Sequence, residues 1–212
     1  MTEVRADFLA AAGVAAELLR TDAVAAAWSQ PSALPKFSVA GLAGHLAFQI
    51  LAIPRIVAQP VPVEPVIPLT AHYQRVAWVN AGLDDEINVN IRAGGDAEAA
   101  GGPAALVAQV DAMLAKLNES LAGEPNRAVR LAFWGAWSLS LDDMLLARTM
   151  ELVVHSDDLA VSVGSPTPEF PSGPFNAVLD LLSRLAVGRH GQAAVLRALS
   201  RRERAPDTIV AF

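Results

Sequence analysis

The segment RTMELVVHSDD, residues 148–158, contains a Glu and a His four residues apart. In a helix, Glu151 and His155 lie one turn apart on the same face, close enough to bind one metal ion together. If His45, in the segment LAGHL at residues 42–46, joins them, the chain supplies three protein ligands and leaves one coordination position open. An open position is typical of a catalytic metal site rather than a structural one.

These residues also have a simpler interpretation. Glu151 would then be exposed, His155 would be a hydrogen-bonded residue of the core, and Arg148 would pair with Glu151 on the surface. His45 interrupts an otherwise apolar helix, where an unpaired polar group costs on the order of 2 kcal/mol. It therefore needs a partner, which either a metal ion or another polar group of the core supplies. Spacing alone leaves both interpretations open.

Composition favours an all-α protein. Of the 212 residues, 53% are hydrophobic and only 6% are aromatic. Ala, the best helix former, contributes much of the hydrophobic share, and the β-branched residues do not form alternating runs. Apolar residues at helical spacing predict long helices over residues 2–28, 38–59, 70–92, 103–121 and 140–164, and two shorter helices over 175–189 and 191–203. We therefore expect a helix bundle with long crossovers.

Proline and glycine mark the connections between these helices. We predict loops over residues 29–37, 60–68 and 164–174, and a turn bracketed by Gly94-Gly95 and Gly101-Gly102-Pro103. The alternating segment 127–133 predicts a short strand or an extended crossing segment, and the apolar residues 208–212 are expected to dock onto the body. These elements divide into a helical bundle, residues 1–165, and a short C-terminal helical extension, residues 166–212, packed on it.

The charge pattern argues against nucleic acid as a partner. The net charge is −6, and the basic residues gather only at Arg201, Arg202 and Arg204, whereas a nucleic-acid surface needs a coherent basic stripe. The most apolar segment, residues 39–53, is too short to span a bilayer of about 30 Å. We expect a cytoplasmic protein with no membrane segment. The exposed faces of its Ala-rich helices are compatible with a homodimer.

The candidate ligands indicate which metals and which chemistry the site takes. Glu and His side chains suit zinc, and nickel, iron or manganese could use the same nitrogen and oxygen atoms. The chain contains no cysteine. Any thiolate in its chemistry must therefore come from a small molecule.

Two segments together resemble a known family. SVAGLAGHL at residues 38–46 and ARTMELVVHSDDL at residues 147–159 resemble the mycothiol-dependent maleylpyruvate isomerase family, which belongs to the DinB-like superfamily of metal-binding four-helix bundles. The resemblance covers roughly residues 5–165. It implies a DinB-like four-helix bundle in which His45, Glu151 and His155 bind a divalent metal, usually zinc.

The resemblance also implies a co-substrate. Mycothiol, the low-molecular-weight thiol of actinobacteria, would bring its sulfur to the open position, and the Ala-rich composition with more Arg than Lys is compatible with an actinobacterial source. Family members that act as maleylpyruvate isomerases carry a second α/β domain after the bundle, whereas residues 166–212 here are expected to be helical. The expected function is a metalloenzyme that is S-transferase-like or isomerase-like and uses a zinc-activated thiol on an electrophilic substrate.

Two other functions compete with this one. The first is a non-catalytic bundle that binds a small ligand or partner, and its metal is absent or structural. The second is a hydrolase that keeps the metal but uses bound water without any thiol.

Several neighbouring residues are candidates for supporting roles. Asp158 is either an acceptor that fixes the His155 tautomer or a charge near the end of the helix. Arg148 either binds an anionic substrate or the cofactor, or forms an ordinary ion pair with Glu151. His72 either lines the cleft as an acid or base or is exposed, and we prefer the exposed position. We assign no role to His190. The four tryptophans are expected in the core or in a pocket wall: Trp28, Trp78, Trp134 and Trp137.

Overall fold

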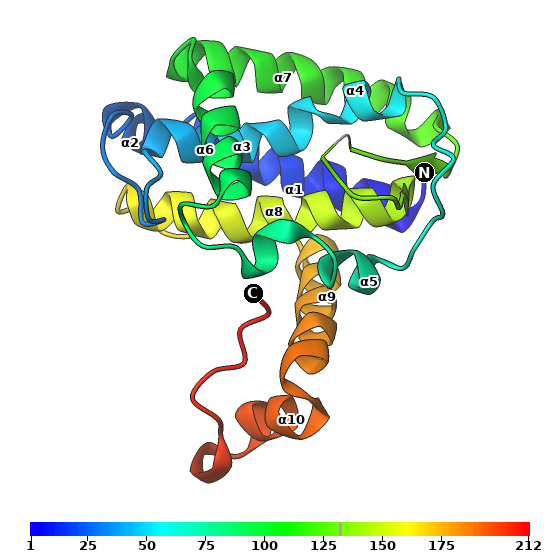
Figure 1. The fold of residues 1–212 in the computed structure, drawn as a ribbon. Coiled ribbons are helices and arrows are strands. Elements are labelled where there is room, and N and C mark those ends of the chain that lie inside the picture. Colours follow the sequence, from blue (N-terminus) through cyan, green and yellow to red (C-terminus); the bar gives the residue numbers. More distant parts are fainter. Residues whose placement is uncertain (132) are drawn as a thin grey trace.

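Four long helices pack side by side in the computed structural model, which describes residues 1–131 and 133–212. Figure 1 shows that two of them run in one direction and the other two in the opposite direction. They are α1 (Glu3–Leu19), α3 (Val39–Leu51), α7 (Pro103–Ser120) and α8 (Leu141–Ser162). Helices α1 and α3 each contact both α7 and α8. The predicted all-α helical bundle is confirmed.

Shorter elements connect and flank the bundle. Strand β1 lies within the segment 127–133, where a short strand was one of the two predictions, and β2 lies after it, directly before α8. The two strands pair in antiparallel orientation. Residue 132 of that segment lies outside the described residues. The shorter elements are α2 (Asp22–Ala26), α4 (Ile53–Val57), α5 (Leu69–Tyr73), η1 (Ala77–Asn80), α6 (Glu86–Ala99), η2 (Leu121–Gly123), β1 (Ala128–Val129), β2 (Leu139–Ser140), α9 (Ser172–His190), α10 (Gln192–Ser200) and η3 (Arg202–Arg204).

Serine caps begin the two helices that carry the candidate ligands. The Ser38 hydroxyl accepts a hydrogen bond from the Gly41 N–H at the start of α3, at 2.9 Å. The Ser140 hydroxyl accepts one from the Asp143 N–H at the start of α8, at 3.0 Å. Each cap satisfies a backbone donor that has no partner within the helix. Both predicted helix starts are thereby confirmed.

Two predicted helices are interrupted. The helix expected over residues 2–28 ends at Leu19, and α2 starts after Thr21, whose hydroxyl accepts the Val24 N–H. The helix expected over residues 38–59 divides at Ala52, next to Pro54, which has no N–H to donate to the preceding turn. Local capping and proline chemistry therefore override the longer periodic pattern.

The predicted helix over residues 70–92 is wrong. The segment forms α5, then the short η1, and α6 begins only at Glu86. The Asp85 carboxylate accepts the Gly82 N–H at 2.8 Å, which stabilises a turn directly before α6. Asp commonly forms such local bonds, and they compete with helix continuation.

The predicted turn is found at its second end, where Gly101 and Gly102 precede α7, but not at Gly94-Gly95, because both of those residues lie inside α6. Figure 1 shows α6 crossing α3. At this crossing, a Cβ on Gly44 would overlap the carbonyl oxygen of Gly95, and a Cβ on Gly95 would overlap the carbonyl oxygen of Gly41. These glycines let two helix backbones touch, and breaking a helix is not their role here.

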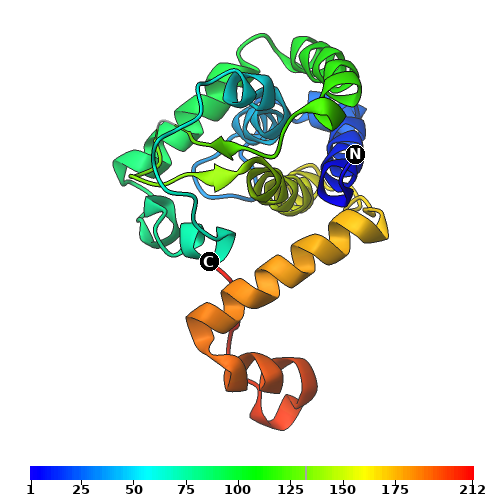
Figure 2. The same ribbon diagram turned by 90° about the vertical axis from the view of Figure 1, so that its right-hand side faces the viewer.

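The C-terminal residues form an arm beside the bundle. Helix α9 contacts α1, α5 and α8, while α10 lies farther from the bundle (Figure 2). The predicted docking of residues 208–212 is seen at Phe212, whose ring centroid lies 5.4 Å from that of Tyr73 and 5.1 Å from that of Trp78. None of the helices in the described part of the chain combines the length and the apolar character needed to cross a membrane.

Candidate metal centre

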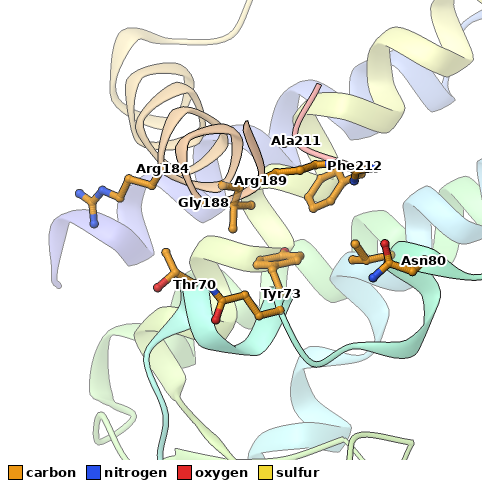
Figure 3. A pocket seen from close by; sticks show the side chains of 11 residues that line it. Thr70, Tyr73, Asn80, Arg184, Gly188, Arg189, Ala211 and Phe212 are labelled. Carbon is orange, nitrogen blue, oxygen red and sulfur yellow. The ribbon is translucent and has the colours of Figure 1, made fainter. Parts of the chain in front are cut away.

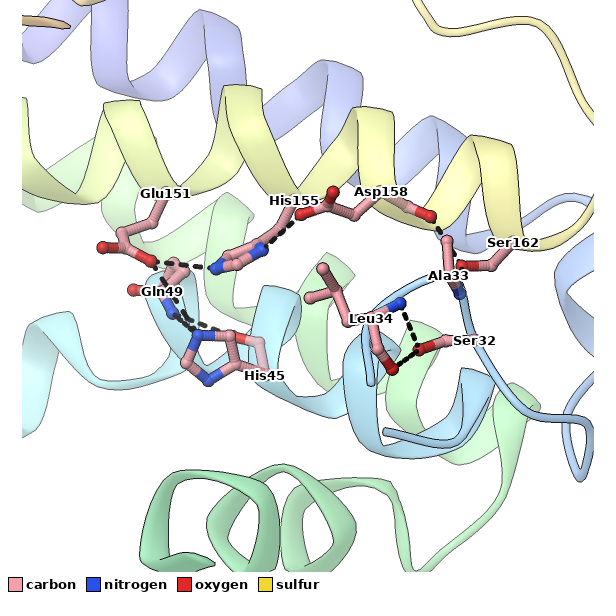
Figure 4. A network of polar contacts seen from close by, with 9 residues as sticks. All are labelled: Ser32, Ala33, Leu34, His45, Gln49, Glu151, His155, Asp158 and Ser162. Carbon is pink, nitrogen blue, oxygen red and sulfur yellow. Dashed lines mark hydrogen bonds and ion pairs between the residues drawn. The ribbon is translucent and has the colours of Figure 1, made fainter. Parts of the chain in front are cut away.

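The candidate ligands meet in the interior of the bundle. His45 projects from α3, and Glu151 and His155 project from α8, which runs in the opposite direction (Figure 4). The Nε2 atom of His155 lies 3.0 Å from the Oε2 atom of Glu151, and the Nε2 atom of His45 lies 3.8 Å from the same oxygen. One ligand atom from each of the three side chains lies within 4.8 Å of the others.

This spacing fits a metal ion. Ligand atoms about 2.0–2.1 Å from a tetrahedral zinc ion are about 3.3 Å from one another. The two distances from Glu151 lie on either side of that value, and the side chains would have to move inward only where the ligand atoms are up to 4.8 Å apart. Two imidazole nitrogens and one carboxylate oxygen also match the ligand types of open zinc sites. The described cluster could therefore hold a divalent cation.

Solvent reaches the cluster only to a limited extent. The side chains of His45, Glu151 and His155 are 16%, 13% and 18% exposed. Each is largely desolvated, yet each keeps an edge that a small molecule could contact. This partial burial is what a site with an open coordination position needs.

Asp158 lies behind His155. Its Oδ2 atom is 2.9 Å from the Nδ1 atom of His155, while the Nε2 atom of the same ring faces Glu151. Burial acts to lower the pKa of His155, but the hydrogen bonds with Asp158 and Glu151 outweigh it and raise the pKa to about 9. Without a metal, the ring is therefore an imidazolium at neutral pH that donates one hydrogen bond to each carboxylate.

The other two ligands are already in the form that a metal requires. Burial alone would raise the pKa of Glu151, but its hydrogen bond with His155 and the nearby His45 ring hold that pKa well below the usual value. Burial lowers the pKa of His45, so its ring is neutral at neutral pH. Glu151 is thus a carboxylate and His45 offers a nitrogen lone pair. Only His155 has to lose a proton before it can ligate.

We accordingly expect metal binding to release about one proton below pH 9, because the proton on Nε2 of His155 occupies the position of the metal bond. The apparent affinity should rise about tenfold per pH unit from pH 7 to about 9 and then level off. Isothermal titration calorimetry in buffers of different ionisation enthalpy measures the proton count. The Asp158→Asn variant is the control, since it lowers the pKa of His155 and should release fewer protons at pH 7.5. Binding without proton release in the unmodified protein would contradict this protonation state.

The free energy of unfolding of the metal-free protein should depend on pH through the protonation of His155. Because folding raises the pKa of His155, its stabilising effect is complete below about pH 6.5, the value of an unperturbed His, and is lost as the pH rises through about 9.

Arg148 does not form the surface ion pair that we considered. The ion pairs of Glu151 with described residues involve His45 and His155. Arg148 is instead buried, at 8% exposure, and its NH1 donates a hydrogen bond of 2.6 Å to the Oε1 atom of Gln49. Its Nε has no hydrogen-bond partner among the residues that the structure describes. Helix α3 covers this face of α8. The pairing of opposite charges three residues apart, which stabilises exposed helices, therefore does not determine the partner of Arg148.

His72 is buried, which corrects the preferred exposed position. Its side chain is 2% exposed, and its Nδ1 atom accepts a hydrogen bond from the indole N–H of Trp137 at 3.0 Å. Burial lowers its pKa to about 4, so the ring is neutral over the physiological range. The ring packs edge-on against Trp134, with centroids 4.6 Å apart. These contacts describe a core histidine with one polar partner.

Two cavities lie away from the candidate metal centre. One, of about 290 Å³, lies between α5, α9 and the C-terminal residues and is lined in part by Tyr73, Arg189 and Phe212 (Figure 3). The other, of about 590 Å³, is lined in part by Val154 and Phe170. Neither is lined by the three candidate ligands. The metal-site hypothesis therefore rests on the side-chain cluster and not on a large cavity.

Sequence reasoning missed Gln49. It is fully buried in α3, one turn after His45, and contacts both His45 and Arg148. The signal was available, because Gln49 interrupts the same apolar helix that made His45 conspicuous.

Comparison with known proteins gives one match. Residues 9–160 match the family model described as the mycothiol maleylpyruvate isomerase N-terminal domain. The match covers more than half of the chain and includes all three candidate ligands, and it ends before α9 begins. No curated protein and no solved structure gives a match.

Proposed function

The chain belongs to the mycothiol maleylpyruvate isomerase N-terminal domain family, and from this premise we propose that it is a metal-dependent enzyme that uses an external thiol. His45, Glu151 and His155 would hold the divalent metal, with zinc the best match to the ligands and nickel, iron or manganese as alternatives. The thiol would be mycothiol. The reaction would be an S-transfer or an isomerisation of an electrophilic substrate.

The observation that carries this proposal is the convergence of the three ligand atoms within 4.8 Å, from two helices far apart in the sequence. A zinc ion held there would lower the pKa of a bound thiol and keep it as a thiolate at neutral pH. No cysteine occurs in the chain. The sulfur must therefore arrive with a small molecule.

The residues around the cluster favour an anion at the open position. Glu151 and Asp158 bring two negative charges. Arg148, whose Nε has no partner in the described part of the chain, brings a positive one. A divalent ion together with Arg148 carries more positive charge than these two carboxylates neutralise. Burial makes the imbalance costly, so a ligand that arrives as an anion is preferred over a neutral one.

Each supporting residue would have a defined task. Asp158 would keep the proton of His155 on Nδ1, which leaves Nε2 free to ligate. Glu151 would supply a carboxylate oxygen whose charge persists at acidic pH because its pKa is low. The partly exposed edges of the ligands would leave room for the thiol and for the electrophile.

The test combines metal content with thiol conjugation. We expect the purified protein to contain about one metal equivalent by elemental analysis and to conjugate mycothiol to a bromobimane. His45→Ala should lose both properties, because two ligands on one helix turn bind weakly. His190→Ala is the matched control, since His190 contacts the backbone oxygen of Val210, on the C-terminal arm.

Three outcomes would contradict the proposal. Stoichiometric metal in His45→Ala would remove His45 from the ligand set. Activity that persists without any added thiol would favour a hydrolase that uses metal-bound water. A protein that neither binds metal nor changes its melting temperature on metal addition would favour a non-catalytic binding module.

A further inference from the structure

Gln49 lies one helix turn after His45 and is fully buried. Its amide has two kinds of contact. The oxygen Oε1 accepts a hydrogen bond from NH1 of Arg148 at 2.6 Å. The nitrogen Nε2 donates to the backbone carbonyl of His45 at 2.9 Å and lies 3.4 Å from Nε2 of the His45 ring (Figure 4).

These partners fix which end of the amide faces the metal centre. A guanidinium group only donates hydrogen bonds, so it requires the amide oxygen. A backbone carbonyl only accepts, so it requires the amide nitrogen. A flipped amide would place a donor against a donor and an acceptor against an acceptor. Arg148 therefore holds Gln49 with its NH₂ group toward His45.

One of the two amide hydrogens is not used by the protein backbone. The first goes to the carbonyl of His45. Among the described residues, the other contact of Nε2 is the ring nitrogen of His45. If that nitrogen is a metal ligand, its lone pair is committed and it cannot accept. The second N–H then needs an acceptor beside the metal centre.

We propose that Gln49 is a specificity-determining residue that donates a hydrogen bond to the anionic ligand at the open position, here the sulfur of a low-molecular-weight thiolate. Arg148 acts through Gln49 as a positioning residue, because it sets the amide orientation. The inference rests on the proposed function, since it assumes a metal on His45. It deepens that function by assigning the residue that distinguishes an anion from a neutral ligand.

If Gln49 only supported the fold, its second amide N–H would not be required. Anchoring Arg148 requires only the amide oxygen, and a Glu at position 49 would provide that acceptor equally well or better. The nitrogen end also donates to the backbone carbonyl of His45, but its second N–H is needed only if a group beside His45 must be recognised. Substitutions that separate the two ends therefore test the inference.

The experiment uses the full chain loaded with cobalt(II), whose visible spectrum reports the coordination sphere. It is titrated with 2-mercaptoethanol, which binds as a thiolate with a charge-transfer band, and separately with imidazole, a neutral ligand. Gln49→Glu keeps the acceptor for Arg148 and removes the donor. Gln49→Met removes both without adding charge. Gln109→Glu, at an exposed position of α7, adds the same charge elsewhere.

We expect Gln49→Glu and Gln49→Met each to lower the affinity for thiolate relative to imidazole by about 10- to 100-fold, the range for a hydrogen bond to a charged group. Gln109→Glu should leave that ratio unchanged. Unchanged selectivity in both position-49 variants would overturn the inference and leave the metal site standing. A loss in Gln49→Glu alone would also overturn it, since charge repulsion then explains the effect. Failure of the unmodified protein to bind cobalt would overturn the proposed function itself.

Discussion

Replacing Glu151 with Gln is expected to weaken divalent-metal binding by at least 100-fold and to abolish any metal-dependent reaction. Glu151 is the one carboxylate in the cluster, and its Oε2 atom lies near both imidazole nitrogens, at 3.0 and 3.8 Å. Loss of a supporting residue behind a ligand already costs 10- to 100-fold in metal affinity. Loss of a direct, charged ligand should cost more. Competition with a chromophoric chelator measures the affinity.

The variant should remain folded, because Gln has nearly the same shape as Glu and its amide can still contact His155. In the metal-free variant the pKa of His155 should fall below about 9, since one of the two carboxylates that raise it is gone. Histidine proton resonances followed through a pH titration measure that pKa. Near-normal metal affinity in a folded Glu151→Gln protein would mean that the metal, if any, binds elsewhere.

The candidate site was predictable where its geometry is local. Glu151, His155 and Asp158 share one face of α8 because their spacing of four and three residues matches the helical repeat. Their proximity therefore follows from the sequence once the helix is recognised. His45 is different, because no local rule relates α3 to α8. Its placement came from the resemblance to a family and from the cost of burying an unpaired histidine.

The supporting contacts were harder to predict because they depend on tertiary burial. The contact between Arg148 and Glu151 is favourable on an exposed helix, but here α3 covers that face and presents Gln49 to the guanidinium. His72 was expected to be exposed at the start of a long helix. It is buried because Trp134 and Trp137, from the connection between β1 and β2, pack against its ring.

The helical class was predictable from composition, whereas some boundaries were not. The helix starts at residues 38 and 140 were predictable, because a serine hydroxyl at each can satisfy a free N–H of the first turn. The glycines of α6 misled the prediction, since a Gly-Gly pair usually marks a turn. Whether a glycine bends the chain or admits a neighbouring backbone depends on what packs against it, and local sequence does not contain that information.

The last prediction compares these two adjacent glycines. Gly95→Ala is expected to destabilise the protein by about 2–3 kcal/mol, the cost of forcing extra atoms into a packed core. The new Cβ would overlap the carbonyl oxygen of Gly41 and lie 3.3 Å from the Cβ of His45. Gly94→Ala, in the same helix, is the matched control: its Cβ meets no neighbouring atom within 4 Å. It should stabilise the protein by about 0.5–1 kcal/mol through helix propensity.

Denaturant unfolding of both metal-free variants measures whether each substitution lowers or raises the free energy of unfolding. Metal titration then measures the effect of each substitution on metal affinity. Because α6 presses against the α3 backbone beside His45, Gly95→Ala should displace that ligand and weaken metal binding as well as folding. Gly94→Ala should leave metal affinity unchanged. Equal effects of the two substitutions on stability would mean that the α3–α6 crossing is not close-packed in solution. Lower stability with unchanged metal affinity in Gly95→Ala would show that the crossing supports the fold without positioning His45.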